Sequence, residues 1–325
     1  MNSYDRGLIS IIIPCYNEEE SLKPFYSELS AVSSCMEKQY GVAFEFLFIN
    51  DGSGDRTLFI IREFAEKDSR VNYISFTRNF GVESAVYAGL ENCMGDFIAV
   101  MDADLQHPPS MLPLMYEAII NEGYDCAGAV RNMGGTGEGA VKSFLARRFF
   151  RLFNSLSETR LVPGATEFTM MARHVADAVL SMPEHSRFSK GIYSWVGFNK
   201  KWLPLPHTER AAGRSKWTLK KKLFYALDGI FSFSTAALTI AFVPGTLLLL
   251  ASIIIFIYIL VNNIFFGGSW AGFPVLLSLI CFIGGIQLFC IGIFGKYLAA
   301  VHTEVKRRPV YIVKEKKTGT VRVGK

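Results

Sequence analysis

Two aspartates separated by a single residue, Asp102 and Asp104, carry the strongest chemical signal in the sequence. They follow an apolar run, residues 97–101, whose composition is typical of a buried β-strand. Carboxylates two residues apart at the end of a strand can approach one point, and Mg²⁺ and Mn²⁺ prefer such oxygen ligands. An isolated Asp-x-Asp pair is also common in turns and at helix caps, so the interpretation needs support from other parts of the chain.

Two further polar stretches give that support, because each also follows a run rich in β-branched or aromatic residues. Residues 8–13 are followed by a stretch that holds Pro14, Tyr16, Asn17 and Glu18, and residues 44–49 are followed by Asp51. In an α/β sheet, ligands bind beyond the carboxyl ends of the strands. We therefore expect the three polar stretches to lie at one edge of a sheet and to form a site.

The wider pattern predicts the α/β class. Further strands are expected at residues 71–76 and 126–130, and helices near residues 20–36, 56–67, 82–92 and 111–121. Strands that alternate with helices predict a mostly parallel sheet covered on both faces.

Several function classes lack their signatures. No Gly-x-Gly-x-x-Gly follows the first strand, and no Gly-Lys-Ser/Thr phosphate loop occurs. The six cysteines form no Cys-x-x-Cys pair and have no cluster of histidines beside them, which disfavours a zinc site or a disulfide framework. The formal net charge of +5 is mild and does not indicate nucleic acid as a partner.

An apolar block dominates the second half of the chain. Residues 229–295 contain no Asp, Glu, Lys, Arg or His. A helix needs about 20 apolar residues to cross a bilayer, so we expect two transmembrane helices, at about residues 236–261 and 273–294, within a membrane part spanning residues 234–295. A buried hairpin in the core of a soluble protein is the alternative, and the length of the uncharged block disfavours it.

Basic residues flank the apolar block on both sides and predict its orientation. Lys220, Lys221 and Lys222 precede it, and Lys306 and Arg307 follow it, whereas the connecting turn carries no charge. The positive-inside rule places both flanks in the cytoplasm. We expect a catalytic domain at residues 1–215, an interfacial amphipathic helix at 216–233 and a basic cytoplasmic tail at 296–325.

The predicted location is the inner cell membrane, as a multi-pass protein with its catalytic domain on the cytoplasmic side. The apolar run at residues 8–13 is too short for a signal peptide and has no basic region or cleavage site around it.

The order of these stretches, together with the apolar block, resembles family 2 glycosyltransferases of the GT-A fold. More narrowly, the chain is similar to the polyprenyl-phosphate glycosyltransferases, which include dolichyl-phosphate mannose synthases and bacterial undecaprenyl-phosphate sugar transferases. The resemblance runs from about Ile9 to about Arg308, and residues 78–81 and 213–216 also match the family pattern.

The resemblance implies a role for each matching residue. The nucleotide would be held by Pro14, Tyr16, Asn17, Glu18, Asp51, Asp102 and Ala103. Asp104 and Gln106 would approach the metal, Mg²⁺ or Mn²⁺, and the diphosphate. Arg131 matches a position that contacts the acceptor phosphate, and Lys142 and Arg147 are further basic candidates, although basic residues on a helix are more often merely solvated. A loop that closes over the site would contain Arg210, Ser215 and Lys216, and the catalytic set would be Asp102, Asp104 and Glu167.

The chain departs from the family pattern at several positions. His107 stands where an Asp is frequent, and Val82 where many relatives carry Lys. In the stretch 166–171, Glu167 keeps a carboxylate, but Thr169 stands where relatives carry an Arg. These departures lie near the expected metal and donor sugar, so the identity of the sugar is the least constrained part of the prediction.

The implied function is transfer of one sugar, from UDP-glucose or UDP-N-acetylglucosamine, to polyprenyl (undecaprenyl) phosphate at the cytoplasmic membrane face, for cell-envelope glycosylation. The Gln-x-x-Arg-Trp motif of processive synthases is absent from the sequence. Two alternatives stay open: another lipid acceptor such as diacylglycerol, and a catalytically inactive membrane scaffold. The expected partners are the donor, the lipid phosphate and the bilayer, and self-association into a homo-oligomer is a further expectation from the resemblance.

Overall fold

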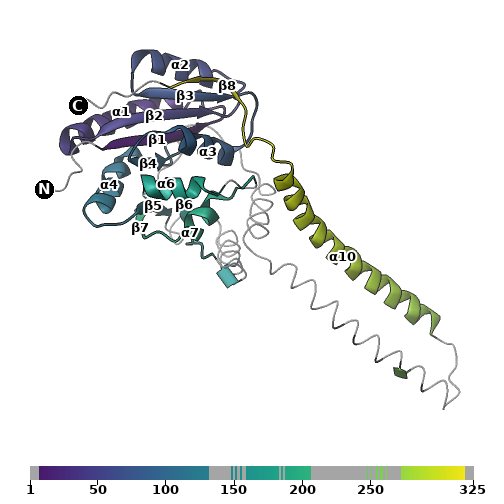
Figure 1. Cartoon of the computed structure of the whole chain (residues 1–325). Helices are drawn as coiled ribbons and strands as arrows, with labels where there is room; N and C mark the ends of the chain where they lie inside the picture. The colour runs from purple at the N-terminus through teal and green to yellow at the C-terminus, as the bar shows by residue number, and fades with distance from the viewer. Residues whose placement is uncertain are drawn as a thin grey trace.

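The computed structural model describes residues 7–131, residues 159–205 apart from Pro183 and Ser186, and residues 272–318, with isolated helical residues between these ranges. In these ranges an eight-stranded sheet has the order β7-β5-β6-β4-β1-β2-β3-β8 (Figure 1). The strands are β1 (Leu8–Cys15), β2 (Ala43–Asn50), β3 (Val71–Phe76), β4 (Phe97–Val100), β5 (Cys126–Arg131), β6 (Ala165–Ala172), β7 (Lys200–Leu205) and β8 (Val313–Lys317).

The prediction of a mostly parallel α/β sheet is confirmed. Strand β1 pairs in parallel with β2 and β4, β2 with β3, and β5 with β7, whereas β6 and β8 run antiparallel to their neighbours. The five strands predicted from β-branched runs are all present. Strands β6, β7 and β8 were not predicted.

Helices cover both faces of the sheet. They are α1 (Leu22–Tyr40), α2 (Thr57–Lys67), α3 (Val82–Asn92), the short 3₁₀ helix η1 (Pro109–Met111), α4 (Leu112–Ile120), α6 (Arg173–Leu180) and α7 (Ser189–Trp195). The four helices predicted for the first part of the chain are present as α1 to α4, with ends that differ by up to four residues from the prediction.

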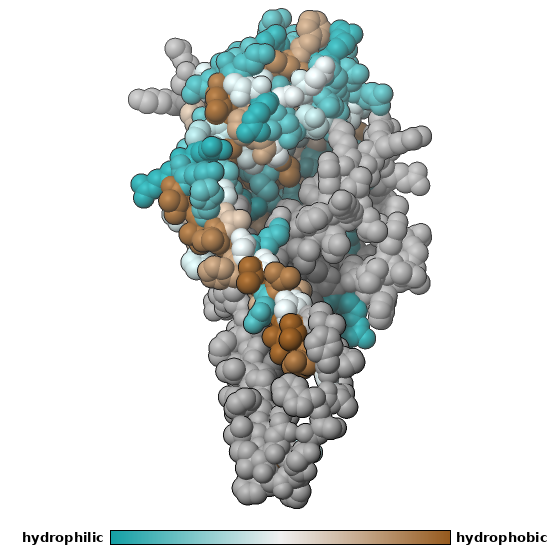
Figure 2. Space-filling model, turned by 90° about the vertical axis from the view of Figure 1, so that its right-hand side faces the viewer, coloured by the Kyte–Doolittle hydropathy of each residue, from teal (hydrophilic) through white to brown (hydrophobic). Residues whose placement is uncertain are grey.

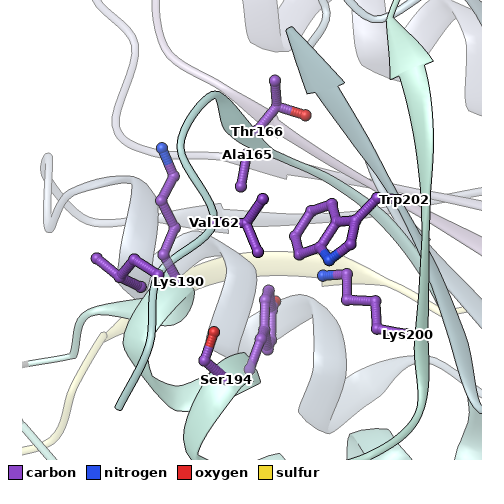
Figure 3. Close-up of a pocket in the computed structure, with 9 residues that line it drawn as sticks. Val162, Ala165, Thr166, Lys190, Ser194, Lys200 and Trp202 are labelled. Atoms are coloured by element: carbon purple, nitrogen blue, oxygen red, sulfur yellow. The ribbon is translucent and has the colours of Figure 1, made fainter. Parts of the chain in front are cut away.

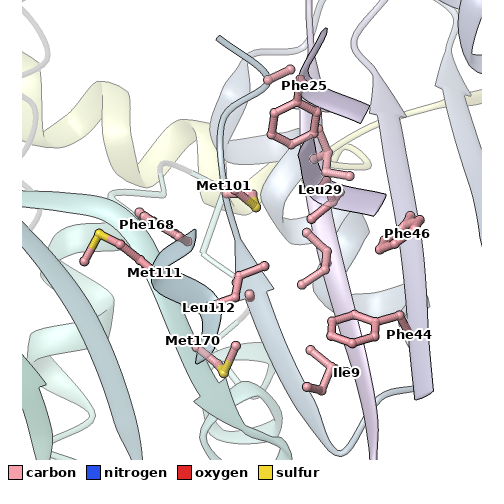
Figure 4. Packing of buried hydrophobic residues seen from close by; sticks show 14 of the residues in the cluster. Ile9, Phe25, Leu29, Phe44, Phe46, Met101, Met111, Leu112, Phe168 and Met170 are labelled. Carbon is pink, nitrogen blue, oxygen red and sulfur yellow. The ribbon is translucent and has the colours of Figure 1, made fainter. Parts of the chain in front are cut away.

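Alternation along the central strands explains why both faces are covered. On β1, Ile9 and Ile11 belong to one buried cluster, with side chains of α1, α2 and α4 (Figure 4), whereas Ile12 belongs to a second cluster, with side chains of α3, α6 and α7. Successive side chains of a strand point to opposite faces of the sheet. A strand that is apolar on both faces therefore becomes the centre of the core, and its polar continuation is left at the edge.

A long helix, α10 (Phe273–Val305), projects from the α/β domain, with its carboxyl end next to the domain (Figure 1). Its segment Phe282–Val305 has a mean hydropathy of 1.6 and none of it is buried, so it is long and apolar enough to cross a membrane. In Figure 2, hydrophilic residues dominate the upper part of the domain, whereas hydrophobic residues gather lower on the molecule.

Among the described residues this is the one helix that could span a membrane, so the predicted two-helix hairpin is not confirmed. The first predicted crossing, residues 236–261, and the predicted interfacial helix, residues 216–233, lie outside the described residues except for isolated helical positions.

The segment predicted as a basic tail, residues 296–325, divides into two structured parts. Its first part continues α10 to Val305, and a later part forms β8 at the edge of the sheet. The backbone N–H of His185 also donates to Glu304 Oε1 at 2.8 Å, so two contacts attach the carboxyl end of α10 to the α/β domain.

Candidate functional site

The polar stretches that follow β1, β2 and β4 lie together at one edge of the sheet. The backbone N–H of Asp51 donates to Cys15 O at 2.9 Å, and that of Met101 donates to Ile12 O at 3.1 Å. These bonds place the ends of the three strands side by side. The sheet edge that the sequence predicted as the site is therefore assembled.

Side chains join the loops after β1 and β2 into one unit. Asn17, in the left-handed region with a φ of 53°, donates its backbone N–H to Ser53 Oγ at 3.0 Å. Its side-chain oxygen accepts the N–H of Gly54 at 2.8 Å, and the N–H of Glu18 donates to Thr57 Oγ1 at 2.8 Å. Asn is among the few residues that tolerate this conformation. Asn17, expected to contact the nucleotide, thus also fixes the shape of both loops.

Asp51 organises the loop that follows β3. Its buried carboxylate accepts the backbone N–H groups of Phe80 at 2.6 Å and Gly81 at 2.9 Å. Burial raises the pKa of Asp51, while the two amides and the nearby Arg78 oppose that rise. Asp51 was expected to bind the nucleotide directly. Its hydrogen bonds add a second role, which is to position the residues 78–81.

Asp102 and Asp104 follow β4 and have different surroundings. The N–H of Asp102 donates to Nδ1 of His107 at 3.1 Å, and the Oδ1 of Asp104 accepts the N–H of Gln106 at 3.0 Å. The His107 ring is buried and stacks on Phe168, with 5.1 Å between ring centroids. His107, which was expected to depart from the family pattern, therefore supports the loop from inside, with its Nδ1 turned to the backbone.

The surroundings of Asp102 shift the pKa values of Asp102 and His107. Desolvation by the surrounding protein, together with the carboxylates of Asp104 and Glu18, raises the pKa of Asp102 to about 6, against the opposing effect of Lys190 and Arg131. The side chain nevertheless keeps 44% of its surface accessible, so the carboxylate is crowded by protein but open to a ligand. Burial lowers the pKa of His107 to about 4, so its imidazole is neutral at physiological pH.

Arg131 at the end of β5 reaches the loop that carries the aspartates. Its Nη2 donates to Oε1 of Gln106 at 2.8 Å. The amide oxygen that was expected to approach a metal thus accepts a hydrogen bond from a guanidinium. Gln106 thus links Arg131 to the loop that carries the aspartates, and its approach to a metal stays a prediction.

Glu167 on β6 faces the same edge and has a basic neighbour. Nζ of Lys190, from α7, lies 3.9 Å from Oε1 of Glu167. Burial raises the pKa of Glu167, Lys190 lowers it, and the negative charge of Asp102 raises it. Lys190 thus interacts electrostatically with two carboxylates of the predicted catalytic set. A single lysine on a short helix gives no sequence signal, so Lys190 was not predicted.

A small pocket lies beside this edge, between α7 and the strands β6 and β7 (Figure 3). It is lined by Leu161, Val162, Ala165, Thr166, Lys190, Tyr193, Ser194, Lys200 and Trp202. Lys200 Nζ donates to Thr169 Oγ1 at 3.0 Å and lies 4.4 Å from the centre of the Trp202 ring. Burial lowers the pKa of Lys200 to about 8. Lys200 thus contacts Thr169, one of the positions at which the chain was expected to depart from the family pattern.

The remaining predicted residues differ in accessibility. Ala103 is buried, Pro14 is half-buried, and Tyr16 has 40% of its surface exposed. Lys142, Arg147, Arg210, Ser215 and Lys216 lie outside the described residues, so the predictions for the acceptor phosphate and the closing loop rest on the sequence for these positions.

The described residues contain no group of three or more His, Cys, Asp or Glu side chains arranged around a metal site. Asp102 and Asp104 nevertheless fit a hard divalent cation, because the charge of Asp104 raises the pKa of Asp102 and a cation relieves that repulsion. Mg²⁺ is usually held by one or two carboxylates together with substrate phosphates, so two protein ligands suffice.

Known proteins that resemble the chain identify its family. Residues 10–180 match the model of Glycosyl transferase family 2. The putative glycosyltransferase CsbB of Bacillus subtilis (strain 168) is 40% identical over 310 residues, which cover 95% of this chain and 92% of that protein. The SfII prophage-derived bactoprenol glucosyl transferase of Shigella flexneri is 37% identical over 311 residues, covering 96% of this chain and 99% of that protein.

Solved structures are more distant in sequence. The mannosyltransferase PcManGT from Pyrobaculum calidifontis, in complex with GDP-Man and Mn²⁺, is 13% identical, with a TM-score of 0.45, and the match covers 90% of this chain and 87% of that one. Family assignment therefore rests on the sequence matches. The acidic sheet edge and these matches together show that the chain is a glycosyltransferase that belongs to family 2.

Proposed function

We propose that the protein transfers one glucosyl residue from UDP-glucose to polyprenyl phosphate at the cytoplasmic face of the membrane. The observation that carries the proposal is the 37% identity to a bactoprenol glucosyl transferase along 99% of that enzyme's length. The prophage bactoprenol glucosyl transferase homolog of Escherichia coli (strain K12) is 38% identical over 309 residues, which cover 95% of this chain and 99% of that protein. Both matches extend beyond the α/β domain into the apolar block of residues 229–295.

The donor occupies the edge formed by the loops after β1, β2 and β4. The nucleotide lies against Pro14, Tyr16, Asn17, Glu18 and Ala103, with Asp51 behind them. Asp102 and Asp104 hold a divalent cation, Mg²⁺ or Mn²⁺, which would neutralise charge on the departing diphosphate. Asp104 is the ligand that we assign with most weight, because Gln106 is engaged by Arg131.

An oxygen of the lipid phosphate forms the new bond to C1 of the glucose. The bond between C1 and the diphosphate oxygen breaks, and its electron pair leaves with UDP. A phosphate monoester is already ionised near neutral pH, since its second pKa is about 6, so this acceptor needs no strong general base. The protein's contribution is to position the two substrates and to stabilise charge.

Basic residues beside the carboxylates receive the acceptor. Lys190 and Arg131 both act on the charge of Asp102, and Lys190 lies beside Glu167. We assign the acceptor phosphate to these two side chains, with Lys142 and Arg147 as further candidates from the sequence. Glu167 orients the acceptor or the sugar, and a loop that contains Arg210, Ser215 and Lys216 closes over the site.

The membrane part is a hairpin with helices at about residues 236–261 and 273–294, in the inner membrane. Two contacts that attach the carboxyl end of α10 to the α/β domain support this topology. If α10 crosses the bilayer, its far end lies on the opposite side, and the chain that comes from β7 must cross once to reach it. The catalytic domain and the end of α10 then share the cytoplasmic side.

Radiolabel transfer tests the proposal. Purified full-length protein is supplied with labelled UDP-glucose or UDP-N-acetylglucosamine, with undecaprenyl phosphate or diacylglycerol, and with Mg²⁺, Mn²⁺ or a chelator. We expect label in a mild-acid-labile lipid only with UDP-glucose, undecaprenyl phosphate and a metal. Label in diacylglycerol would move the assignment to another acceptor. Folded protein that binds UDP but labels no lipid would favour a scaffold.

A further inference from the structure

The segment that follows α10 contacts the edge of the sheet where the nucleotide is proposed to bind. The transfer reaction by itself does not explain this contact. We call residues 311–317 the C-terminal latch. Strand β8 pairs antiparallel with β3, with Ile74 opposite Lys316 and Ser75 opposite Glu315. The latch therefore completes the sheet on the side where β3 would otherwise be an open edge.

The first residues of the latch reach the end of β3, where the loop of residues 77–81 begins. The backbone N–H of Thr77 donates to Ile312 O at 3.0 Å. The Tyr311 ring stacks on Phe76, with centroids 4.9 Å apart and 23° between the planes. Phe76 in turn meets the edge of Phe80 at 5.8 Å.

Phe80 is the residue whose backbone N–H binds the Asp51 carboxylate at 2.6 Å. The contacts thus run from Tyr311 through Phe76 and Phe80 to Asp51, in the loop that ends β2. Neighbouring Gly52 allows this close approach, because a Cβ there would lie 2.3 Å from the carbonyl carbon of Arg78. A shift of residues 78–81 would therefore displace the loop after β2.

The hydroxyl of Tyr311 fixes the ring from the other side. It donates to Glu91 Oε2 at 2.5 Å and accepts from Asn92 Nδ2 at 3.2 Å. Both partners lie at the end of α3, the helix that starts directly after Gly81. The ring is thus held between the strand that enters the loop and the helix that leaves it.

We propose that Tyr311 is a positioning residue for the nucleotide-sugar, which holds the loop of residues 77–81 against Asp51 and so links the end of the membrane helix to the donor site. This inference rests on the proposed function, because it assigns the nucleotide to the edge beside Asp51. Tyr311 acts through Phe76 and Phe80 and touches no substrate.

The test compares the loss of two contacts that the latch makes with the α/β domain. Tyr311→Ala removes the stacked ring, whereas Arg62→Ala removes the ion pair with Glu315, whose atoms approach to 2.6 Å at the far end of the latch. Tyr311→Phe keeps the ring and removes the hydroxyl. UDP affinity is measured by calorimetry on full-length protein in nanodiscs with Mn²⁺, and donor KM, acceptor KM and kcat by lipid labelling.

We expect Tyr311→Ala to raise the Kd for UDP and the donor KM about tenfold, in the range of typical coupling between sites, with kcat and the acceptor KM within about twofold of wild type. Arg62→Ala should leave the UDP affinity within about twofold, because an exposed ion pair contributes little. Tyr311→Phe should lie between the wild type and Tyr311→Ala, since it keeps the stacked ring and loses the hydrogen bonds to Glu91 and Asn92.

Three results would overturn the inference. The first is unchanged UDP affinity in folded Tyr311→Ala. The second is an equal loss of UDP affinity in Arg62→Ala, which would assign the effect to tail docking in general. The third is a loss confined to kcat or to the acceptor KM. A wild-type protein that binds no UDP overturns both this inference and the proposed function, whereas wild-type transfer with an unaffected Tyr311→Ala overturns the latch alone.

Discussion

At the scale of single residues, Asp102 and Asp104 have identical side chains but different neighbours. Asp102 lies close to Lys190 and Arg131, which lower its pKa against the effect of desolvation. Asp104 is engaged through the N–H of Gln106 at the turn of the loop. In the proposed mechanism both would hold the cation, and the lysine and arginine beside Asp102 would receive the acceptor.

Asp104→Asn tests the assignment of the leaving-group charge. We expect the transfer rate to fall about 100-fold or more at saturating metal, because a neutral amide binds the cation far less well. Asp177→Asn, an exposed position on α6, makes the same change of charge away from the site and should keep the wild-type rate. Both proteins should melt at the wild-type temperature. Full activity of Asp104→Asn at saturating metal would remove the metal assignment.

The buried Lys200 predicts a dependence of stability on pH. Its pKa falls from 10.5 to about 8 on burial, so between these values the unfolded chain binds a proton that the folded chain does not. Stability should therefore rise with pH through this window, relative to Lys200→Met, by an amount on the order of a few degrees in Tm. Melting curves at several pH values check this. Lys201→Met, on the same strand, is the control, and an identical pH profile in both variants would contradict the prediction.

The sequence predicted the acidic residues but not their basic partners. Asp102 and Asp104 stand out because two carboxylates directly follow an apolar strand. Lys190 has no such context, and only the packing of α7 against β6 brings it within 3.9 Å of Glu167. The contact of Lys200 with Thr169 likewise depends on the register between β5, β6 and β7, which local sequence does not encode.

At the scale of elements, the loops that follow β2 and β3 form the tightest contact at the site. Gly52 has a φ of 64°, and its Cα faces the backbone of Arg78 and Asn79. Only a residue without a Cβ fits this position, because both the backbone conformation and the space exclude a side chain. Because Gly52 has no side chain, the two loops can pack directly against one another.

Gly52→Ala should weaken UDP binding at least tenfold, since the new methyl group would displace the loop after β3 and a non-Gly residue in the left-handed region costs about 1–2 kcal/mol. Gly54→Ala is the matched control, because a Cβ there meets nothing within 4 Å. Calorimetric titration of both variants with UDP measures the difference. Equal affinities in the two proteins would show that the close approach is not needed for binding.

Strands β7 and β8 were not predicted because their local sequences do not indicate a buried strand. Strand β8 reads Val-Lys-Glu-Lys-Lys, and charged residues are typical of edge strands, where they discourage pairing with other chains. Strand β7 contains Pro204, which argues against a central strand when read alone. Tertiary contacts select these strands, whereas the five predicted strands carry their own apolar signal.

At the scale of the whole molecule, the chain leaves the sheet at the end of β7. After helix α10 it returns to the same sheet as β8 (Figure 1). These two strands are the opposite edges of the same sheet. The proposed membrane part is therefore connected through the chain to both edges of the sheet.

Reporter fusions test the predicted topology. Green fluorescent protein fused after Lys325 should fluoresce, and alkaline phosphatase inserted after Gly268, in the predicted turn, should be active, because the enzyme folds only outside the cytoplasm. The reverse fusions, with the two reporters exchanged, should both be inactive. Phosphatase activity from a fusion after Lys325 would contradict the hairpin and the cytoplasmic placement of β8.

The pairing of β8 with β3 also has a consequence for how the protein is made. The ribosome synthesises β8 after α10, so the sheet stays incomplete, with β3 as an open edge, until α10 has been made. An open edge strand can pair with another chain. Closure of the sheet thus waits for the end of α10, and an α/β domain cut off before α10 would keep an open edge that favours aggregation.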